Sequence, residues 1–441
     1  MFKYKKLVYN TFLLSCTSLL MSLIGMAFQV WLVGRIGSAG IGLYQLVLSV
    51  TGLLTTFAVS GIRFAATRLV SEEIGCDNDR GIGAAMVRCL GYGLFFGLAA
   101  GAILWFLAQP LGFLWIGDAR TVRSLRISAL SMPCAALCAC ISGYFTACSR
   151  VWKPTLIHLL EQLAGIALVA LCLKRAPHGD IEASCAAVTL GRLAADILSL
   201  ILMLAAYVGD RMRYFRARGG GEKLTARMLK IALPLAVSAY TRSALTTIQN
   251  LLVPRGLKAA GYSADGALSG YGTIQGMVLP IIFFPSCIMS ALAELIVPEL
   301  TEAQMRREHR EINRVTGKLF RMSLVFSCAV AVFLFVFSDM LGQAIYKSAQ
   351  AGHYIRILAP LVPVMYTDMC IDGFLKGLGQ QVWSMGINIL DALAGLLMVW
   401  QLLPRWGLAA YIAIIYLTEL LNFVLSIWRL STVLGRNQAS V

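Results

Sequence analysis

Charged residues are scarce in this sequence of 441 residues. Asp, Glu, Lys and Arg together make up 14% of it, whereas a soluble chain carries about 25%, so a soluble globular fold is excluded. The phosphate-binding pattern GxxxxGK[ST] is missing, which argues against direct drive by ATP in this chain. Only four histidines occur, and no Ser/His/Asp or Cys/His set stands at a recognisable catalytic spacing. We therefore expect a protein that is not an enzyme.

Apolar residues, in contrast, form long blocks. They account for 58% of the chain, and about 20 of them in a row can cross a bilayer as a helix. The blocks of this length are roughly residues 7–33, 40–62, 84–108, 126–148, 154–173, 183–207, 229–252, 269–297, 316–338, 355–375, 383–403 and 408–428. The sequence therefore predicts an all-α integral membrane protein with about 12 transmembrane helices. The first block is too long for a signal-peptide core, and we expect it to be a retained helix.

The basic excess lies mainly between the apolar blocks. The net charge is +16, and the most basic loops, residues 209–230 and 302–318, fall on the same side as the N-terminal MFKYKK. Lys and Arg accumulate in the cytoplasmic loops of membrane proteins. We therefore expect a multi-pass protein of a bacterial cell (plasma) membrane with cytoplasmic N and C termini, and no nucleic-acid partner.

Most of the twelve cysteines lie inside the apolar blocks, where a thiol behaves as a small apolar side chain. Cys134, Cys138 and Cys140 form the densest group. No histidine or carboxylate accompanies them in that block, and their spacing matches no zinc motif. We expect no metal site, and no cofactor other than H⁺ or Na⁺ as a coupling ion.

The chain contains an internal repeat. Residues 133–173 align without a gap on residues 363–403, an offset of 230, and the identities include both prolines and several small residues. Six predicted helices separate equivalent positions, and an even number preserves orientation in the membrane. The sequence thus predicts two six-helix lobes related by a parallel pseudo-twofold repeat: an N-terminal lobe at 1–208, a basic glycine-rich cytoplasmic connector at 209–227 and a C-terminal lobe at 228–441.

Two motifs resemble a known family. The stretches GRIGSAGIGLYQL (34–46) and SGIRFAATRLVSEE (60–73) look like the start of the stage V sporulation protein B-like polysaccharide and oligosaccharide flippases. These belong to the multidrug/oligosaccharidyl-lipid/polysaccharide (MOP) exporter superfamily and are related to lipid II flippases. Lipid II flippases usually have fourteen helices, whereas this chain has room for about twelve.

The resemblance implies flipping of a polyprenyl-pyrophosphate-linked sugar from the inner to the outer leaflet by alternating access. Arginine suits the anionic headgroup because its planar fork binds phosphate oxygens bidentately. The candidate headgroup-binding residues are Arg63, Arg242, Arg68, Arg35 and Arg255. Arg242 stands halfway down the first helix of the second predicted lobe, and an interhelical ion pair is its alternative role. For Arg68, a boundary ion pair with Glu72 at i,i+4 is the alternative, and interfacial anchoring is the alternative for Arg35 and Arg255.

Carboxylates inside the predicted spans are candidates for ion coupling. Glu161 and Asp391 occupy equivalent positions of the repeat, and Asp368 and Asp372 are spaced at i,i+4 in YTDMCIDGFLKG. A structural role is open for all four. Arg192 and Asp196, one helical turn apart, are expected to form a structural ion pair.

Two further classes of function compete with the flippase. A MATE-type multidrug or cation antiporter would want an acidic residue in the cavity of the first lobe, but the first two spans contain no Asp or Glu. A non-transporting scaffold for envelope assembly would leave charges in the spans unexplained. The flippase is therefore favoured, with a lipid-linked oligosaccharide and the bilayer as partners and a monomer as the expected state.

Overall fold

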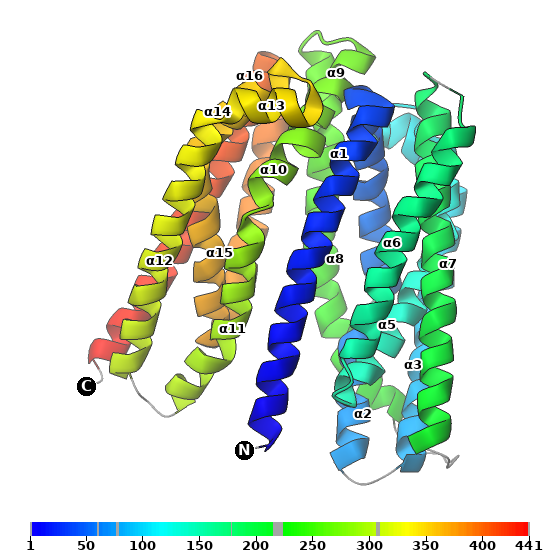
Figure 1. The fold of residues 1–441 in the computed structure, drawn as a ribbon, viewed down its shortest axis with the longest axis vertical. Helices are drawn as coiled ribbons and strands as arrows, with labels where there is room; N and C mark the ends of the chain where they lie inside the picture. Colours follow the sequence, from blue (N-terminus) through cyan, green and yellow to red (C-terminus); the bar gives the residue numbers. More distant parts are fainter. Residues whose placement is uncertain are drawn as a thin grey trace. The chain divides into compact units, whose positions relative to one another are not determined.

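Helices make up the regular structure of this chain (Figure 1). The computed structural model describes residues 2–59, 61–75, 79–177, 179–214, 224–305 and 309–439. No strand occurs within these ranges, so the prediction of an all-α protein is confirmed. Contacts divide the chain into two compact units, which we call unit 1 (Met1–Thr17 and Leu43–Thr247) and unit 2 (Ser18–Gly42 and Ile248–Val441).

Unit 1 is built on a buried core between α2, α3, α5, α7 and α8. Its elements are α1 (Phe2–Val59) from Leu43 onwards, α2 (Ile62–Gly75), α3 (Asp79–Pro110), the π-helix η1 (Leu111–Ile116), α4 (Thr121–Ala129), α5 (Met132–Ala147), α6 (Trp152–Arg175), α7 (Ile181–Tyr214) and α8 (Leu224–Ala259) as far as Thr247.

Unit 2 combines an early segment of the chain with its second half. Its elements are α1 from Ser18 to Gly42, α8 from Ile248, α9 (Ala264–Gly272), the π-helix η2 (Thr273–Val278), α10 (Leu279–Phe283), α11 (Ser286–Met305), α12 (His309–Val336), α13 (Ser338–Tyr346), α14 (Ala349–Leu358), the 3₁₀-helix η3 (Ala359–Leu361), α15 (Val362–Gly377) and α16 (Gln381–Ala439).

The units differ from the predicted lobes by two segments. Residues 18–42 pack with unit 2, where the Ser38 and Ser269 hydroxyls lie 2.6 Å apart and Gln29 donates a hydrogen bond to the Gly276 carbonyl. A Cβ on Gly272 would stand 2.1 Å from the Ser38 carbonyl oxygen, so glycine permits this close helix contact. Conversely, α8 as far as Thr247 packs in unit 1.

The helices are long and apolar enough to span a membrane. The described residues contain eight such stretches, or nine if the bent pair α4 and α5 counts as one span. Two of the eight are 57 and 55 residues long, more than twice the ~20 residues of one crossing. α1 breaks at Gly37 and α16 at Gly407, both at positive φ. The predicted layout of about 12 spans in two halves fits this structure.

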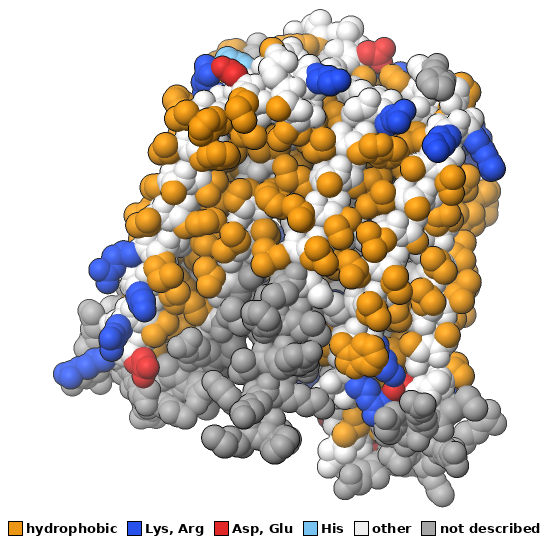
Figure 2. All heavy atoms as spheres, viewed as in Figure 1, with side chains coloured by type: hydrophobic (Ala, Val, Ile, Leu, Met, Phe, Trp, Pro, Cys, Tyr) orange, Lys and Arg blue, Asp and Glu red, His pale blue; other side chains and the backbone are white. Residues whose placement is uncertain are grey.

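Apolar side chains cover much of the surface. Figure 2 shows them along the helices on the face drawn, whereas Lys and Arg gather towards helix ends. Phe95, Phe106 and Trp400 are exposed, as expected for side chains that face lipid acyl chains rather than water.

The internal repeat extends to backbone detail at the ends of α5 and α15. Ser149 and Gly379, 230 residues apart, both adopt positive φ, at 54° and 68°. Behind each, the next N–H bonds back to the helix: Arg150 N donates to the Phe145 carbonyl, and Gln380 N donates to the Leu375 carbonyl. This is the left-handed Schellman ending of a helix. The two halves of the repeat therefore share individual backbone hydrogen bonds.

The same two helices make equivalent close contacts within their units. α5 packs on α2, and α15 packs on α11. A Cβ on Gly143 would lie 2.5 Å from the Arg63 carbonyl oxygen, and one on Gly373 would lie 2.8 Å from the Ala293 Cβ. Arg63 and Ala293 are again 230 positions apart. Each contact requires glycine, because any side chain would push the paired helices apart.

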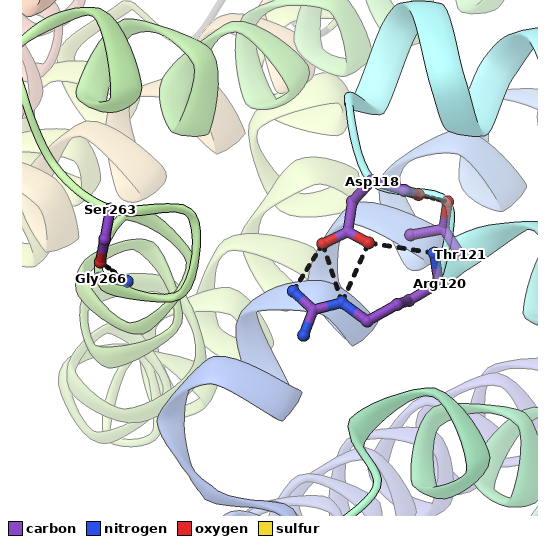
Figure 3. Close-up of polar contacts among 5 residues, drawn as sticks. All are labelled: Asp118, Arg120, Thr121, Ser263 and Gly266. Carbon is purple, nitrogen blue, oxygen red and sulfur yellow. Dashed lines mark hydrogen bonds and ion pairs between the residues drawn. The ribbon is translucent and has the colours of Figure 1, made fainter.

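Short polar contacts organise the beginnings of α4 and α9, each within its own unit (Figure 3). Before α4, the Asp118 carboxylate accepts from the Arg120 backbone N–H at 3.0 Å and from its Nη2 at 2.7 Å. The Thr121 hydroxyl donates to the Asp118 carbonyl. At α9, Ser263 Oγ accepts from Gly266 N at 3.0 Å. The Ser263 contact satisfies a backbone N–H left without a partner at a helix start, whereas the Asp118 contacts stabilise the turn before α4.

Candidate functional site

Unit 1 contains a cavity of about 320 Å³ between α1, α5 and α7. Its polar lining consists of Tyr44, Thr51, Thr55, Ser128, Ser131, Thr189, Arg192 and Asp196. Threonines 51 and 55 lie one turn apart on α1, so both face the same way. The cavity is therefore rich in hydroxyl groups and carries one charge of each sign.

Several hydroxyls of this cavity already use their hydrogens. Thr51 Oγ1 donates to the Val47 carbonyl at 2.9 Å and Thr55 Oγ1 to the Thr51 carbonyl at 2.8 Å. Ser131 Oγ donates to the Ser128 carbonyl at 2.8 Å. A hydroxyl has a single hydrogen and two lone pairs. These groups therefore present acceptors to the cavity, which suits a ligand that carries hydrogen-bond donors or a positive charge.

Arg192 and Asp196 face this cavity together. Arg192 interacts with the Tyr44 hydroxyl as well as with Asp196. The ion pairs within 4 Å that occur among the described residues do not include Arg192 with Asp196, although both side chains are described. The two side chains attract each other electrostatically, and the structural ion pair stays a prediction. Both side chains line the cavity beside Tyr44.

The arginines of the GIRFAATR stretch lie on a separate helix. Gly61, with a φ of 71°, precedes α2, and a Cβ there would stand 2.7 Å from the Ala232 carbonyl oxygen of α8. Arg63 lies in the first turn of α2 and is exposed. Arg68 Nε lies 3.0 Å from Glu72 Oε1, which is the ion pair that the i,i+4 spacing predicts. The ion pairs found within the described ranges do not include Arg63.

Arg242 belongs to unit 1. The sequence had placed it in the predicted C-terminal lobe. The neighbouring Tyr240 ring packs on Phe57 with centroids 5.4 Å apart. One turn further on, Thr247 Oγ1 donates to the Ser49 carbonyl at 3.1 Å. These contacts join α8 to the last part of α1 and leave Arg242 exposed.

The remaining two candidate arginines lie in unit 2. Arg35 is exposed, with its guanidinium 5.8 Å from the centroid of the Trp31 ring. Arg255 is exposed on α8, directly before Gly256, which packs on Leu403. The stacking of Arg35 on an indole fits the interfacial anchoring that is its alternative role.

The repeat-equivalent carboxylates Glu161 and Asp391 differ in their hydrogen bonds. Glu161 Oε2 accepts from the Ser199 hydroxyl at 2.6 Å and lies 3.2 Å from His158 Nδ1. Asp391 Oδ1 is buried without a hydrogen-bond partner among the described residues. A buried oxygen in that state costs free energy that a bound cation or proton would remove.

Asp368 and Asp372, one turn apart on α15, also differ. Asp372 Oδ2 lies 2.5 Å from Lys376 Nζ, and its other oxygen accepts from the Ser384 hydroxyl. Both Asp372 and Lys376 line a cavity of about 250 Å³ within unit 2. Asp368 Oδ1 is buried without a hydrogen-bond partner in the described parts of the chain, whereas the carboxylate as a whole interacts with the Ser426 hydroxyl and with the charges of Asp372 and Asp391.

Sequence reasoning missed the hydroxyl-lined cavity itself. Its signal is present but spread out: hydroxyls at i,i+4 on α1, two serines before α5, and a threonine, an arginine and an aspartate on one face of α7. Each set alone is ordinary in a membrane helix, because small hydroxyls bond their own backbone there. Only the packing of the helices brings the three sets together.

The fold is similar to that of solved membrane transporters. It is similar to the inward-facing structure of a multidrug resistance MATE family transporter of the MOP superfamily, with a TM-score of 0.69, 13% identity and coverage of 94% of this chain and 95% of that one. It is also similar to a MOP superfamily transporter from Pyrococcus furiosus, with a TM-score of 0.64, 13% identity and coverage of 96% and 94%.

The sequence comparisons identify the family. The model of the polysaccharide biosynthesis protein family matches residues 7–287, and that of the MatE family matches residues 256–400. Stage V sporulation protein B of Bacillus subtilis (strain 168) is 24% identical over 407 residues, 90% of this chain and 78% of that protein. Sporulation protein YkvU of the same strain is 20% identical over 393 residues, 86% of each. The chain belongs to the polysaccharide biosynthesis protein family, and it is a multi-pass membrane transporter or flippase of the MOP superfamily.

Proposed function

We propose that this protein flips a polyprenyl-pyrophosphate-linked sugar, a lipid II-like precursor of cell wall or polysaccharide, from the inner to the outer leaflet by alternating access. The observation that carries the proposal is the pair Arg63 and Arg242 in unit 1. Both are exposed in helices of a membrane protein, and neither belongs to an ion pair found within the described ranges. An arginine held in a membrane helix without a carboxylate is costly and is kept for function.

The chemistry of the two parts of such a substrate matches two features of unit 1. A pyrophosphate needs cationic donors, which arginines supply. Sugar hydroxyls need acceptors, which the threonines and serines of the 320 Å³ cavity offer. Arg68 would add to the headgroup site only if it left Glu72. Arg35 and Arg255 of unit 2 would act on the headgroup after flipping.

Coupling to H⁺ or Na⁺ is part of the proposal. Of the four candidate carboxylates, Asp391 is the best placed, because it holds a buried oxygen without a hydrogen-bond partner among the described residues; Asp368 also holds such an oxygen, but its carboxylate interacts with Ser426. Glu161 and Asp372 are already occupied by hydrogen-bond partners. We propose a monomer in a bacterial cell membrane, with cytoplasmic termini.

The test is translocation in proteoliposomes of a fluorescent polyprenyl-pyrophosphate sugar. Wild type is compared with Arg63→Ala, Arg242→Ala and a control, Arg175→Ala, which removes an exposed arginine from the last turn of α6. We expect a loss of about tenfold or more for the first two, because a charge-assisted hydrogen bond contributes about 1.5–3 kcal/mol. Equal rates in all four proteins, each folded and inserted, would refute the proposed role of both arginines.

A MATE-type multidrug or cation antiporter is the second candidate function, and one observation favours it. Asp196 lines the unit 1 cavity, whose hydroxyls present acceptors. An acceptor-rich cavity with a carboxylate suits an organic cation, although Arg192 also lines it. For the Pyrococcus furiosus relative, a reversed polarity of the binding pocket is said to suggest a different function. Efflux of a cationic dye that Asp196→Asn abolishes, without flipping of the lipid-linked sugar, would select this candidate.

A further inference from the structure

A second cavity in unit 1 lies where α6 begins and α7 ends. Its volume is about 520 Å³, and its described lining consists of Arg150, Trp152, Lys153, Ala205, Ala206, Gly209 and Asp210. It shares no lining residue with the hydroxyl-rich cavity. None of its charged residues is among the headgroup candidates of the proposed function.

Its charges are arranged around one buried carboxylate. The Asp210 side chain is fully buried, and its oxygens lie 2.5 Å from Arg150 Nη1 and 2.6 Å from Lys153 Nζ. The Tyr144 hydroxyl donates to the same carboxylate at 3.0 Å. Two cations thus share one anion, so the described lining has an excess positive charge. The side chains of Arg150 and Lys153 are 24% and 23% exposed, which leaves part of each facing the cavity.

The cavity lies at the membrane boundary. Trp152–Arg175 and Ile181–Arg211 are both candidate spans, so the first turn of α6 and the last turns of α7 mark span ends. Trp152 is exposed, and the Lys153 ammonium lies 5.9 Å from the centroid of its ring. Tryptophans and lysines collect at the level of lipid headgroups, where one end is apolar and the other is wet.

The backbone adds to the positive potential at the same place. The start of α6 carries no side-chain cap hydrogen bond from Val151. The first turn of a helix bears a partial positive charge that favours phosphate, although here Lys153 N already donates to the Arg150 carbonyl and Pro154 has no N–H. The Schellman turn at Ser149 fixes how α5 leads into this start.

We propose that this cavity binds the phosphate group of an anionic membrane lipid. Arg150 and Lys153 contact the phosphate oxygens, Trp152 and the two alanines contact the glycerol and the first acyl carbons, and Asp210 holds the two cations in place. The site would keep a lipid at the end of unit 1 during transport, and it does not depend on the substrate of the flippase. The apolar part of the lining favours a lipid over free phosphate.

The test measures lipid retention by the full-length protein in detergent, using native mass spectrometry. Phosphatidylglycerol, zwitterionic phosphatidylcholine of the same chains, and inorganic phosphate serve as the three probes. Lys153→Ala is compared with Lys174→Ala, which removes an exposed lysine from the other end of the same helix. We expect Lys153→Ala to lower phosphatidylglycerol retention about fivefold and Lys174→Ala to leave it unchanged.

Folding is controlled separately. Lys153→Ala leaves Asp210 paired with Arg150, so the protein should still elute as wild type, and Lys153→Arg should restore retention. Asp210→Asn releases both cations, so its melting temperature should fall without lipid and rise with added phosphatidylglycerol more than that of wild type. Equal retention by Lys153→Ala and Lys174→Ala, or displacement of the lipid by millimolar inorganic phosphate, would overturn the proposal.

Discussion

The turn between α5 and α6 in unit 1 and the corresponding turn between α15 and α16 in unit 2 have the same backbone conformation. We call each turn, with the side chains packed on it, a corner. The charged side chains of the two corners differ. In unit 1 the central group is a carboxylate, Asp210, held by Arg150 and Lys153. The positions equivalent to these two cations are Gln380 and Trp383. In unit 2 the central group is a cation: Arg429 Nη2 donates to Gln380 Oε1 at 2.5 Å, and its guanidinium lies 4.2 Å from the centroid of the Trp383 ring.

The difference shows what the repeat conserves. The Schellman turn and the close glycine contact are backbone features that decide whether the helices fit. The central polar group of a corner needs only partners of complementary charge or hydrogen bonding. In unit 1 a carboxylate has two cations as partners, and in unit 2 an arginine has an amide and an indole. The corner with two cations is the one beside the 520 Å³ cavity, which is why we place a lipid there.

The largest effect should come from breaking the centre of the unit 1 corner. Asp210→Ala leaves Arg150 and Lys153 close together without their anion, and we expect a loss of about 3 kcal/mol in stability. Gln380→Ala in unit 2 removes a neutral amide and leaves Arg429 on Trp383, so we expect about 1 kcal/mol. Thermal unfolding in detergent measures both. Equal losses would mean that the two corners are held by the same kind of interaction.

Adding a methyl group to the glycine contacts should have the next largest effect. Gly143→Ala brings a Cβ to 2.5 Å from the Arg63 carbonyl oxygen, and Gly373→Ala brings one to 2.8 Å from the Ala293 Cβ. We expect a loss of about 2 kcal/mol for each, because neither a backbone carbonyl nor an alanine Cβ, which is fixed to its backbone, can move aside alone. Gly52→Ala is the control for a glycine-to-alanine change within a helix, because no atom lies within 4 Å of the added Cβ.

The two Schellman turns give a reciprocal pair of smaller effects. Ser149 adopts positive φ with a side chain, whereas Gly379 does so without one. Ser149→Gly should therefore stabilise the protein and Gly379→Ser should destabilise it, each by about 1 kcal/mol. The melting temperatures of the two variants should move in opposite directions. Movement in the same direction would show that local packing outweighs the backbone preference.

The smallest effect is expected from giving unit 2 a carboxylate. Gln380→Glu places an anion on Arg429, and both side chains are half-buried. We expect a gain of about 0.5 kcal/mol, since partly exposed ion pairs add little. High salt should remove this gain in the free energy of unfolding. Gln380→Asn, which adds no charge, is unfolded at the same salt concentrations as the control.

Hydropathy and the internal repeat were sufficient to predict the class of fold, because span length and turn chemistry are local properties. The i,i+4 pair of Arg68 with Glu72 was predictable for the same reason. Arg192 and Asp196 have the same spacing but extend into a cavity, whose existence depends on three helices at once. The packing of α8 as far as Thr247 with unit 1 could not be predicted either, because hydropathy identifies a span but not the helices that it contacts.

The packing of residues 18–42 with unit 2, and of α8 as far as Thr247 with unit 1, has a consequence for biosynthesis. Ser38 leaves the ribosome early, but its partner Ser269 lies 231 residues later. At about 5–20 residues per second, the first helix waits roughly 10–45 s before its neighbour is made. During that interval residues 18–42 must reside in the bilayer without the contacts that complete unit 2. Unit 1 is finished only when translation has passed Thr247, so neither half of the gene encodes a complete folding unit.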